Sequence, residues 1–147
     1  MKTYTTQTTV AGLPDEVLSL LTEPDAIARW APIPFEVTDL DTDRLVAGSH
    51  ARVRGGLAGR NLEFDVEVFE ADDGRLSLVA SGPISIDVEY VVTPADSGSE
   101  VTASVSVSGS GLMGRVLASA TDALLAAGAL NTAVSRIGRE LEPALAA

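Results

Sequence analysis

The side chains of this sequence that could act chemically are few, and three of the basic ones lie close together. His50, Arg52 and Arg54 alternate with Ala51 and Val53 along one predicted strand. Because successive residues of a strand point to opposite faces, the three basic side chains share a face, which we expect to be solvated. In a shifted register they would instead form a basic cluster inside the protein, suited to a carboxylate ligand held by an arginine fork.

Three further candidates are Tyr90, Asn131 and Trp30. Tyr90 shares a strand face with apolar residues, Asn131 lies on the apolar stripe of a predicted C-terminal helix, and Trp30 ends a short helix. Each has a structural interpretation: a core aromatic, a buried amide with its hydrogen bonds satisfied, and a packing anchor. Each also has a functional one: a hydrogen-bond donor or acid, a group that orients a ligand, and a ligand contact at a cavity mouth.

The acidic side chains and the glycines give weaker signals. Asp65, Asp87 and Glu89 lie on polar strand faces, so we expect a solvated exterior rather than a carboxylate pair for acid–base catalysis. Gly55-Gly56 and Gly59 do not lead from a strand into a helix, which excludes a nucleotide-binding loop. They indicate a bend or a bulge in a curved sheet.

Composition limits the classes of protein to consider. The 147 residues favour one domain spanning 1–147. The absence of cysteine excludes disulfides, thiolate metal sites and a cysteine nucleophile, and a single histidine excludes a site with two histidine ligands. A net charge of −11 disfavours nucleic acid as a partner. No apolar run has the length of a signal peptide or a membrane span, so we expect a cytoplasmic protein, either a monomer or a homodimer.

The elements that must position these side chains follow from the hydrophobic patterns. The sequence predicts a first strand over Lys2–Val10, two short helices between Pro14 and Trp30, and six strands between Phe35 and Ser108. The seven strands in sequence, with short turns, suggest a strongly curved antiparallel meander. Asp73-Gly74 is a hairpin signal. The predicted fold class is α+β.

The last predicted element is one long helix over Leu112–Glu142, with an apolar stripe and a length of about 45 Å. Its middle is nearly all alanine and glycine. Two interpretations stay open: small residues let the sheet and the helix pack closely, which leaves no cavity, or they make room for a ligand.

This order of elements is that of the helix-grip fold, and several short motifs agree with it. The chain resembles the polyketide cyclase/dehydrase group of the START-related superfamily. The motifs are Leu13-Pro14-Asp15-Glu16-Val17, Leu20-Leu21-Thr22-Glu23-Pro24, Trp30-Ala31-Pro32, Val46-Ala47-Gly48-Ser49 and Gly111-Leu112-Met113-Gly114-Arg115. The resemblance implies a curved seven-stranded antiparallel sheet wrapped around a long C-terminal helix, with two short helices after the first strand. It also implies a hydrophobic cavity between sheet and helix, and no cofactor.

Three functions are consistent with these observations. The chain could bind or carry a small hydrophobic molecule, act as a polyketide cyclase or dehydratase, or serve as a non-catalytic interaction module whose cavity is collapsed. The enzyme hypothesis requires at least two of Tyr90, Asn131 and the basic cluster to converge inside the pocket. We predict no metal site, and no catalytic residue can be assigned. The residues predicted to bind a ligand are Trp30, Phe64, Tyr90, Leu124 and Asn131.

Overall fold

The computed structural model describes residues 2–30, 35–41, 43–57, 60–96, 98–109 and 111–141. Strands and helices follow one another in the predicted order until the last element. They are β1 (Lys2–Val10), α1 (Pro14–Thr22), α2 (Pro24–Trp30), β2 (Phe35–Leu40), β3 (His50–Leu57), β4 (Arg60–Asp72), β5 (Arg75–Ser81), β6 (Ser85–Ala95), β7 (Gly98–Ser108), α3 (Gly111–Ala126) and α4 (Ala129–Leu141).

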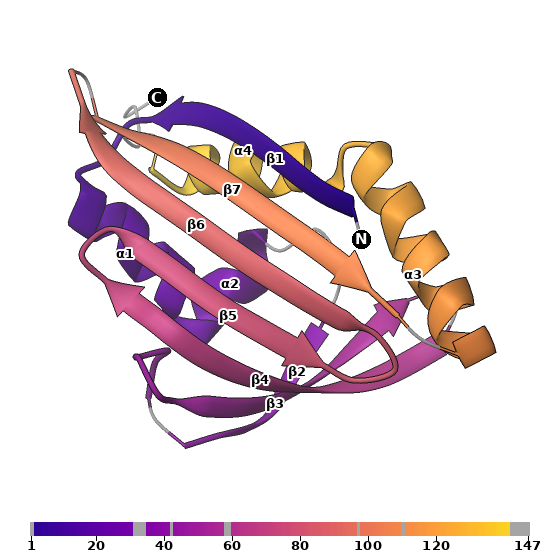
Figure 1. Ribbon diagram of the computed structural model, residues 1–147. Coiled ribbons are helices and arrows are strands. Elements are labelled where there is room, and N and C mark those ends of the chain that lie inside the picture. Colours follow the sequence, from indigo (N-terminus) through magenta and orange to yellow (C-terminus); the bar gives the residue numbers. More distant parts are fainter. Residues whose placement is uncertain are drawn as a thin grey trace.

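The strands form one seven-stranded antiparallel sheet in the order β1-β7-β6-β5-β4-β3-β2. Strands β2 to β7 form a meander as predicted, but the prediction that all seven strands continue it is wrong for β1. Strand β1 pairs with β7 rather than with β2, because α1 and α2 carry the chain from one edge of the sheet to the other (Figure 1). The segment with α1 and α2 therefore connects the two edge strands of the sheet, β1 and β2.

One face of the sheet is apolar and faces the helices. In β7 the side chains of Val101, Ala103, Val105 and Val107 are buried. The alternate residues Thr102, Ser104 and Ser106 are partly exposed. This is the alternation expected of a strand with one dry face. Helices α1, α2 and α4 lie behind the sheet in Figure 1, and α3 stands beside the C-terminal end of β7. The core therefore lies between the sheet and the helices.

The turn between β4 and β5 is the hairpin that the sequence predicts. Asp73 and Gly74 both have positive φ, at 52° and 74°, as a two-residue turn of the primed type requires. Of the bend or bulge predicted at Gly55-Gly56 and Gly59, the bulge is absent at Gly55-Gly56, because both glycines keep a regular register with Leu62 and Asn61. Gly59 lies outside the described residues. The shifts in register lie between Val37 and Asp39 and between Val68 and Glu70.

The C-terminal segment differs from the single long helix that the sequence predicts. It is two helices, α3 and α4, whose axes are bent by 53° at a short break. Gly128 lies in this break with a φ of 101°, which side chains with a Cβ rarely adopt. Its N–H donates to the carbonyl of Leu125 at 3.1 Å, so the end of α3 is capped and the chain turns.

The second of these helices, α4, is held between β1 and the two short helices. Leu130, Ala133, Val134 and Ile137 form its buried face. At its C-terminal end an ion pair joins Glu140 to Arg29 of α2. The break thus lets α4 pack in the core while α3 takes a different direction.

Candidate functional site

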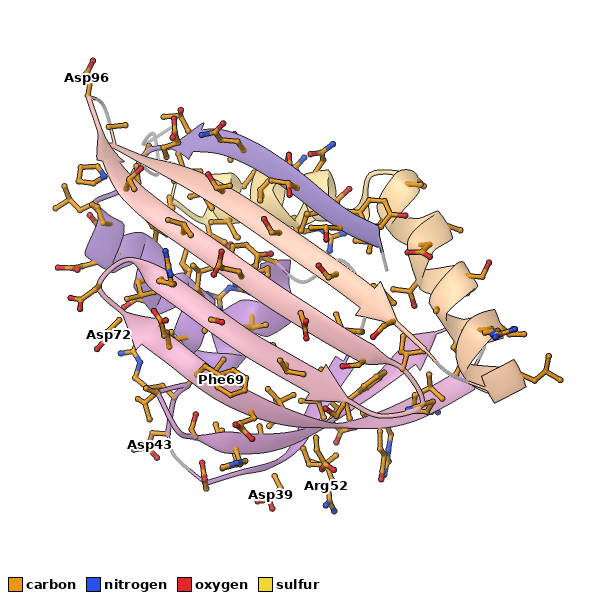
Figure 2. The ribbon with its side chains drawn as sticks, viewed as in Figure 1. Asp39, Asp43, Arg52, Phe69, Asp72 and Asp96 are labelled. Atoms are coloured by element: carbon orange, nitrogen blue, oxygen red, sulfur yellow. The ribbon has the colours of Figure 1, made fainter. Side chains whose placement is uncertain are left out.

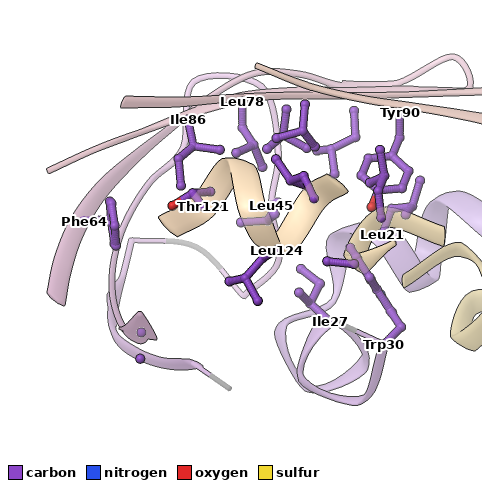
Figure 3. A pocket seen from close by; sticks show the side chains of 18 residues that line it. Leu21, Ile27, Trp30, Leu45, Phe64, Leu78, Ile86, Tyr90, Thr121 and Leu124 are labelled. Carbon is purple, nitrogen blue, oxygen red and sulfur yellow. The ribbon is translucent and has the colours of Figure 1, made fainter. Parts of the chain in front are cut away.

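An apolar cavity of about 260 Å³ lies between the inner face of the sheet and the helices. The close-up in Figure 3 shows aliphatic and aromatic side chains converging on it from strands and helices. Its lining comprises Leu21, Ile27, Trp30, Leu45, Gly55, Gly56, Phe64, Leu76, Leu78, Ile86, Val88, Tyr90, Val105, Thr121, Leu124, Leu125, Ala129 and Leu130.

The period-two pattern of β6 explains how one wall of the cavity is built. Ile86, Val88 and Tyr90 line the cavity, whereas the intervening Asp87 and Glu89 are exposed. Because side chains alternate along a strand, a single apolar face suffices to direct all three into the interior. The neighbouring strands add their own inward residues to the same wall.

The break between α3 and α4 also borders the cavity. Thr121, Leu124 and Leu125 come from the last turns of α3, and Ala129 and Leu130 from the first turn of α4. The bend therefore contributes residues of both helices to the lining. Leu124 remains 40% exposed, which places it at the rim.

Leu45 reaches the cavity from the loop between β2 and β3. Its backbone N–H donates to the carbonyl of Thr22 at 2.9 Å. The guanidinium of Arg44 donates to the Thr22 hydroxyl at 2.7 Å. These two bonds tie the loop to the end of α1 and hold the Leu45 side chain in the core, where it is 8% exposed.

Trp30 and Tyr90 form an aromatic pair at one end of the cavity. Their ring centroids are 5.6 Å apart with an interplanar angle of 62°, an edge-to-face arrangement. The indole N–H of Trp30 donates to the carbonyl of Leu20 at 2.7 Å, which fixes the ring. The pair joins α2 to β6 and closes this end of the cavity (Figure 3).

The Tyr90 side chain is 3% exposed, and no hydrogen-bond partner of its hydroxyl is found among the described residues. Burial raises the pKa of this hydroxyl well above its usual value, because the charged form would be poorly solvated there. The hydroxyl is therefore protonated at neutral pH and can donate a hydrogen bond. It is not a general base.

Four of the five residues predicted to bind a ligand line this cavity: Trp30, Phe64, Tyr90 and Leu124. Asn131 does not. Its side chain is exposed and accepts a hydrogen bond from the hydroxyl of Thr6 on β1. The stripe that predicted a buried Asn131 was counted through the break at Gly128, where the direction and phase of the helix change.

The basic cluster lies on the outer face of the sheet, so the solvated interpretation is confirmed. His50, Arg52 and Arg54 are exposed, and Figure 2 shows Arg52 pointing away from the body of the protein. Arg52 Nε lies 3.2 Å from a carboxylate oxygen of Asp65, directly across the β3–β4 pair. Arg54 of β3 forms the corresponding ion pair with Glu63 of β4, at 3.0 Å.

Several lining residues were not singled out from the sequence. Ile86 and Val88 were visible as members of the apolar face of their strand, and Leu78 belongs to a predicted strand. Leu45 carries no signal, because it lies in an irregular loop whose path depends on tertiary contacts. Gly56 also lines the cavity, and no atom lies within 4 Å of where its Cβ would be, so the lack of a side chain leaves space there.

The Ala/Gly-rich segment makes less room than the favourable interpretation supposed. Ala123, Ala126 and Ala127 are exposed, and only Ala129 of this stretch borders the cavity. The open volume is bounded mainly by larger side chains of the sheet and of α1 and α2. The cavity is nevertheless open, which contradicts the tightly packed alternative.

A second cavity of about 170 Å³ adjoins the first. Ile27, Leu45 and Leu78 line both and separate them. The second cavity extends under β2 and β3, where its walls include Val37 and Val53. All its lining residues are apolar.

Neither a metal cluster nor a membrane-spanning helix is found in the described ranges. No three histidine, cysteine or acidic residues in them are grouped so that they could hold a metal ion. No one helix there has the length and apolar character to cross a membrane; only the bent pair of α3 and α4, taken together, does so by length and composition.

The fold and the cavity define a helix-grip protein with an internal apolar site. The sequence matches the family described as polyketide cyclase/dehydrase and lipid transport over residues 1–142. The chain therefore belongs to this family, which lies within the START-related superfamily and whose members commonly bind hydrophobic ligands. No curated protein matches the sequence.

Solved structures show the same fold at low sequence identity. Protein CV1439 from Chromobacterium violaceum is 15% identical with a TM-score of 0.75, and the alignment covers 97% of this chain and 99% of that one. The protein TTHA0849 from Thermus thermophilus is 14% identical with a TM-score of 0.72, covering 95% and 97%. DynU16, a putative protein in the dynemicin biosynthetic locus, is 24% identical with a TM-score of 0.62, covering 98% of this chain and 48% of that one.

Proposed function

We propose that this protein binds or carries a small hydrophobic molecule in the cavity between its sheet and its helices. The observation that carries the proposal is the open cavity itself, lined by apolar side chains from the sheet, α1, α2 and both C-terminal helices. Ligand sites in proteins are concave and mostly apolar, with few polar groups. Membership of a family described by lipid transport as well as by cyclase activity supports the same function.

The cyclase or dehydratase hypothesis is not supported, because the polar residues that it requires do not come together in the cavity. At least two of Tyr90, Asn131 and the basic cluster had to converge in the pocket, and Tyr90 is the one that lines it. Asn131 is exposed, and the cluster formed by His50, Arg52 and Arg54 lies on the outer face of the sheet. A protonated tyrosine without a second polar side chain gives no acid–base pair for proton transfer.

The hypothesis of an interaction module with a collapsed cavity requires a filled core, and the open cavity does not support it. The structure does expose Leu112, Val116 and Leu124 of α3, at 85%, 55% and 40%. Leu124 also lines the cavity, and a few exposed apolar side chains are ordinary for a protein surface. The cavity therefore supports ligand binding over this alternative.

The experiment that tests the proposal fills the cavity with a larger side chain from strand β6. In Val88→Trp, a bulky side chain would project from β6 into the open volume. Val91→Trp is the matched control, since Val91 lies on the same strand, is partly buried and does not line the cavity. Bound molecules would be detected by native mass spectrometry of the purified proteins, with naphthalene-based probes added at increasing concentration.

We expect wild type and Val91→Trp to bind the probe, and Val88→Trp to lose at least about tenfold in affinity because the volume is occupied. Thermal unfolding would show whether each variant is folded. Equal binding by Val88→Trp and Val91→Trp, with both variants folded, would place the probe elsewhere and refute the proposal.

A further inference from the structure

We propose that the ligand of this cavity is an uncharged molecule whose hydrogen-bond acceptor, a carbonyl, ether or hydroxyl oxygen, binds the hydroxyl of Tyr90. The inference rests on the ligand-binding function proposed above and goes further, since it names the chemical class of the ligand and the residue that selects it. It follows from two observations. The described lining carries no charged residue, and one of its side-chain donors has no hydrogen-bond partner among the described residues.

The first observation is that none of the described lining residues carries a charge. The adjoining cavity is also lined by uncharged, apolar residues. Arg52 and Arg54 of β3 are exposed on the outer face of the sheet and pair with carboxylates on β4. An ionised ligand would lose its hydration without gaining a counter-charge, which costs several kcal/mol even after relaxation. The cavity therefore selects against carboxylates and ammonium ions.

The second observation concerns the polar groups that remain. Three lining side chains have an N–H or O–H group: Trp30, Thr121 and Tyr90. The indole N–H of Trp30 is used by the carbonyl of Leu20, at 2.7 Å. The hydroxyl of Thr121 is used by the carbonyl of Leu117 one turn earlier in α3, at 2.9 Å. Within the described chain, this leaves the hydroxyl of Tyr90 as the side-chain donor of the lining without a partner.

A donor without a protein partner next to an apolar cavity favours a bound molecule that supplies an acceptor. Tyr90 is 3% exposed, and its ring projects from β6 into the space between sheet and helices (Figure 3). Its ring is held edge-to-face against Trp30. A ligand oxygen next to this pair would satisfy the donor, whereas a pure hydrocarbon would leave it unpaired. Since burial keeps the hydroxyl protonated, it favours an acceptor atom.

The test uses three probes of equal size: acetonaphthone, isopropylnaphthalene and naphthoate, all substituted at the same ring position. The first is uncharged with an acceptor, the second is uncharged without one, and the third is an anion. Affinities would be measured by isothermal titration calorimetry at neutral pH. We expect naphthoate to bind at least about a hundredfold more weakly than acetonaphthone, because no cation lines the described wall.

Tyr90→Phe removes the hydroxyl and keeps the ring beside Trp30. We expect it to weaken acetonaphthone by about three- to tenfold, the effect of one neutral hydrogen bond, and to leave isopropylnaphthalene within about twofold. Tyr4→Phe is the matched control. The Tyr4 hydroxyl donates to the carbonyl of Asp122 at 3.3 Å and does not line the cavity, so its loss should not change either affinity.

The outcomes separate this inference from the function on which it rests. If both uncharged probes bind and Tyr90→Phe weakens them equally or not at all, the role of the hydroxyl is refuted while ligand binding stands. Naphthoate binding as tightly as acetonaphthone would refute the uncharged class. If no probe binds the wild-type protein, the proposed function fails together with the inference.

Discussion

Tyr90 serves two purposes that belong to different parts of one side chain. Its ring packs against Trp30 and joins β6 to α2, which is a contribution to stability. Its hydroxyl has no partner among the described residues, so this packing does not require it. A phenylalanine would provide the same packing without the hydroxyl. The ligand contact proposed above would give the hydroxyl a role that the fold does not.

The raised pKa of the Tyr90 hydroxyl predicts how stability depends on pH. In the unfolded chain tyrosine ionises near its usual pKa of about 10, whereas burial keeps the folded-state pKa above that value. Above about pH 10 the unfolded chain therefore loses this proton more readily than the folded chain, so the free energy of unfolding is unaffected by Tyr90 below about pH 10 and falls as the pH rises further. Urea unfolding between neutral pH and strongly alkaline pH should show this decrease.

Tyr90→Phe provides the control for this pH dependence. The variant should lose less stability than wild type over the alkaline range, because one of its two tyrosines no longer titrates. Tyr4 remains, and its pKa is also raised, first by desolvation and then by the charge and hydrogen bond of Asp122. An identical alkaline slope in wild type and Tyr90→Phe would contradict the prediction.

Individual site residues could be predicted where the strand pattern alone decides their direction. Phe64 and Tyr90 lie on apolar faces of strongly alternating strands, and both line the cavity. Asn131 was misplaced because its burial was inferred from a helical period that the chain interrupts at Gly128. Leu45 had no periodic neighbours, since hydrogen bonding of its loop to Thr22 determines its position.

The break between α3 and α4 is the element that most affects the shape of the site. It lets α4 pack against β1 and the short helices while the end of α3 borders the cavity. A straight helix through this point would not give the two segments their 53° difference in direction. The glycine at the break is therefore a structural requirement.

Gly128→Ala tests this requirement. With a φ of 101°, the position disfavours any residue with a Cβ, although no atom lies within 4 Å of where that Cβ would be. We expect a loss of about 1–2 kcal/mol in the free energy of unfolding from backbone strain alone. Chemical denaturation would measure it.

The same substitution at Gly138 is the matched control with the opposite sign. Gly138 lies inside α4, and a Cβ there would meet Val10 Cγ1 at an ordinary contact distance of 3.6 Å. Replacing a glycine in a helix interior by alanine should add about 0.5–1 kcal/mol. If Gly128→Ala also stabilised the protein, the chain would favour a continuous helix and our account of the break would be wrong.

The strands were predictable because alternation and turn residues act locally, as the Asp73-Gly74 hairpin shows. The two short helices were equally clear from Pro14 and Pro24, which begin them. The break was not predicted, because an Ala-Ala-Gly-Ala stretch has a continuous apolar pattern on both sides. Tertiary packing of α4 decided between a bend and a straight helix.

At the scale of the whole molecule, the sheet separates the charged pairs of β3 and β4 from the cavities. The ion pairs between β3 and β4 lie on its outer face, and the two apolar cavities lie on its inner face. The charged residues behind the net charge of −11 are absent from the described lining of both cavities, so this charge affects the outer surface of the protein. The proposed selection of a ligand by shape and by neutrality rests on this uncharged lining.

The two cavities suggest that the site can accept a longer ligand than the first one holds. At about 260 Å³ the first lies just below the range of about 300–1,000 Å³ that is usual for ligand pockets, and joining the second brings it within that range. Ile27, Leu45 and Leu78 form the partition. Of these, Leu78 comes from strand β5, whereas Ile27 belongs to α2 and Leu45 to the loop between β2 and β3.

Leu78→Ala should join the two cavities and change the preferred length of the ligand. We expect its affinity for a methyl ketone with a long alkyl chain to rise relative to a short-chain homologue, because the added methylenes bury apolar surface worth about 0.8 kcal/mol each. Val79→Ala, at the next position and on the opposite face of β5, should leave the ratio of the two affinities as in wild type. Calorimetric titration with both ketones measures this ratio. An unchanged ratio in Leu78→Ala would mean that the second cavity is packing space rather than part of the binding site.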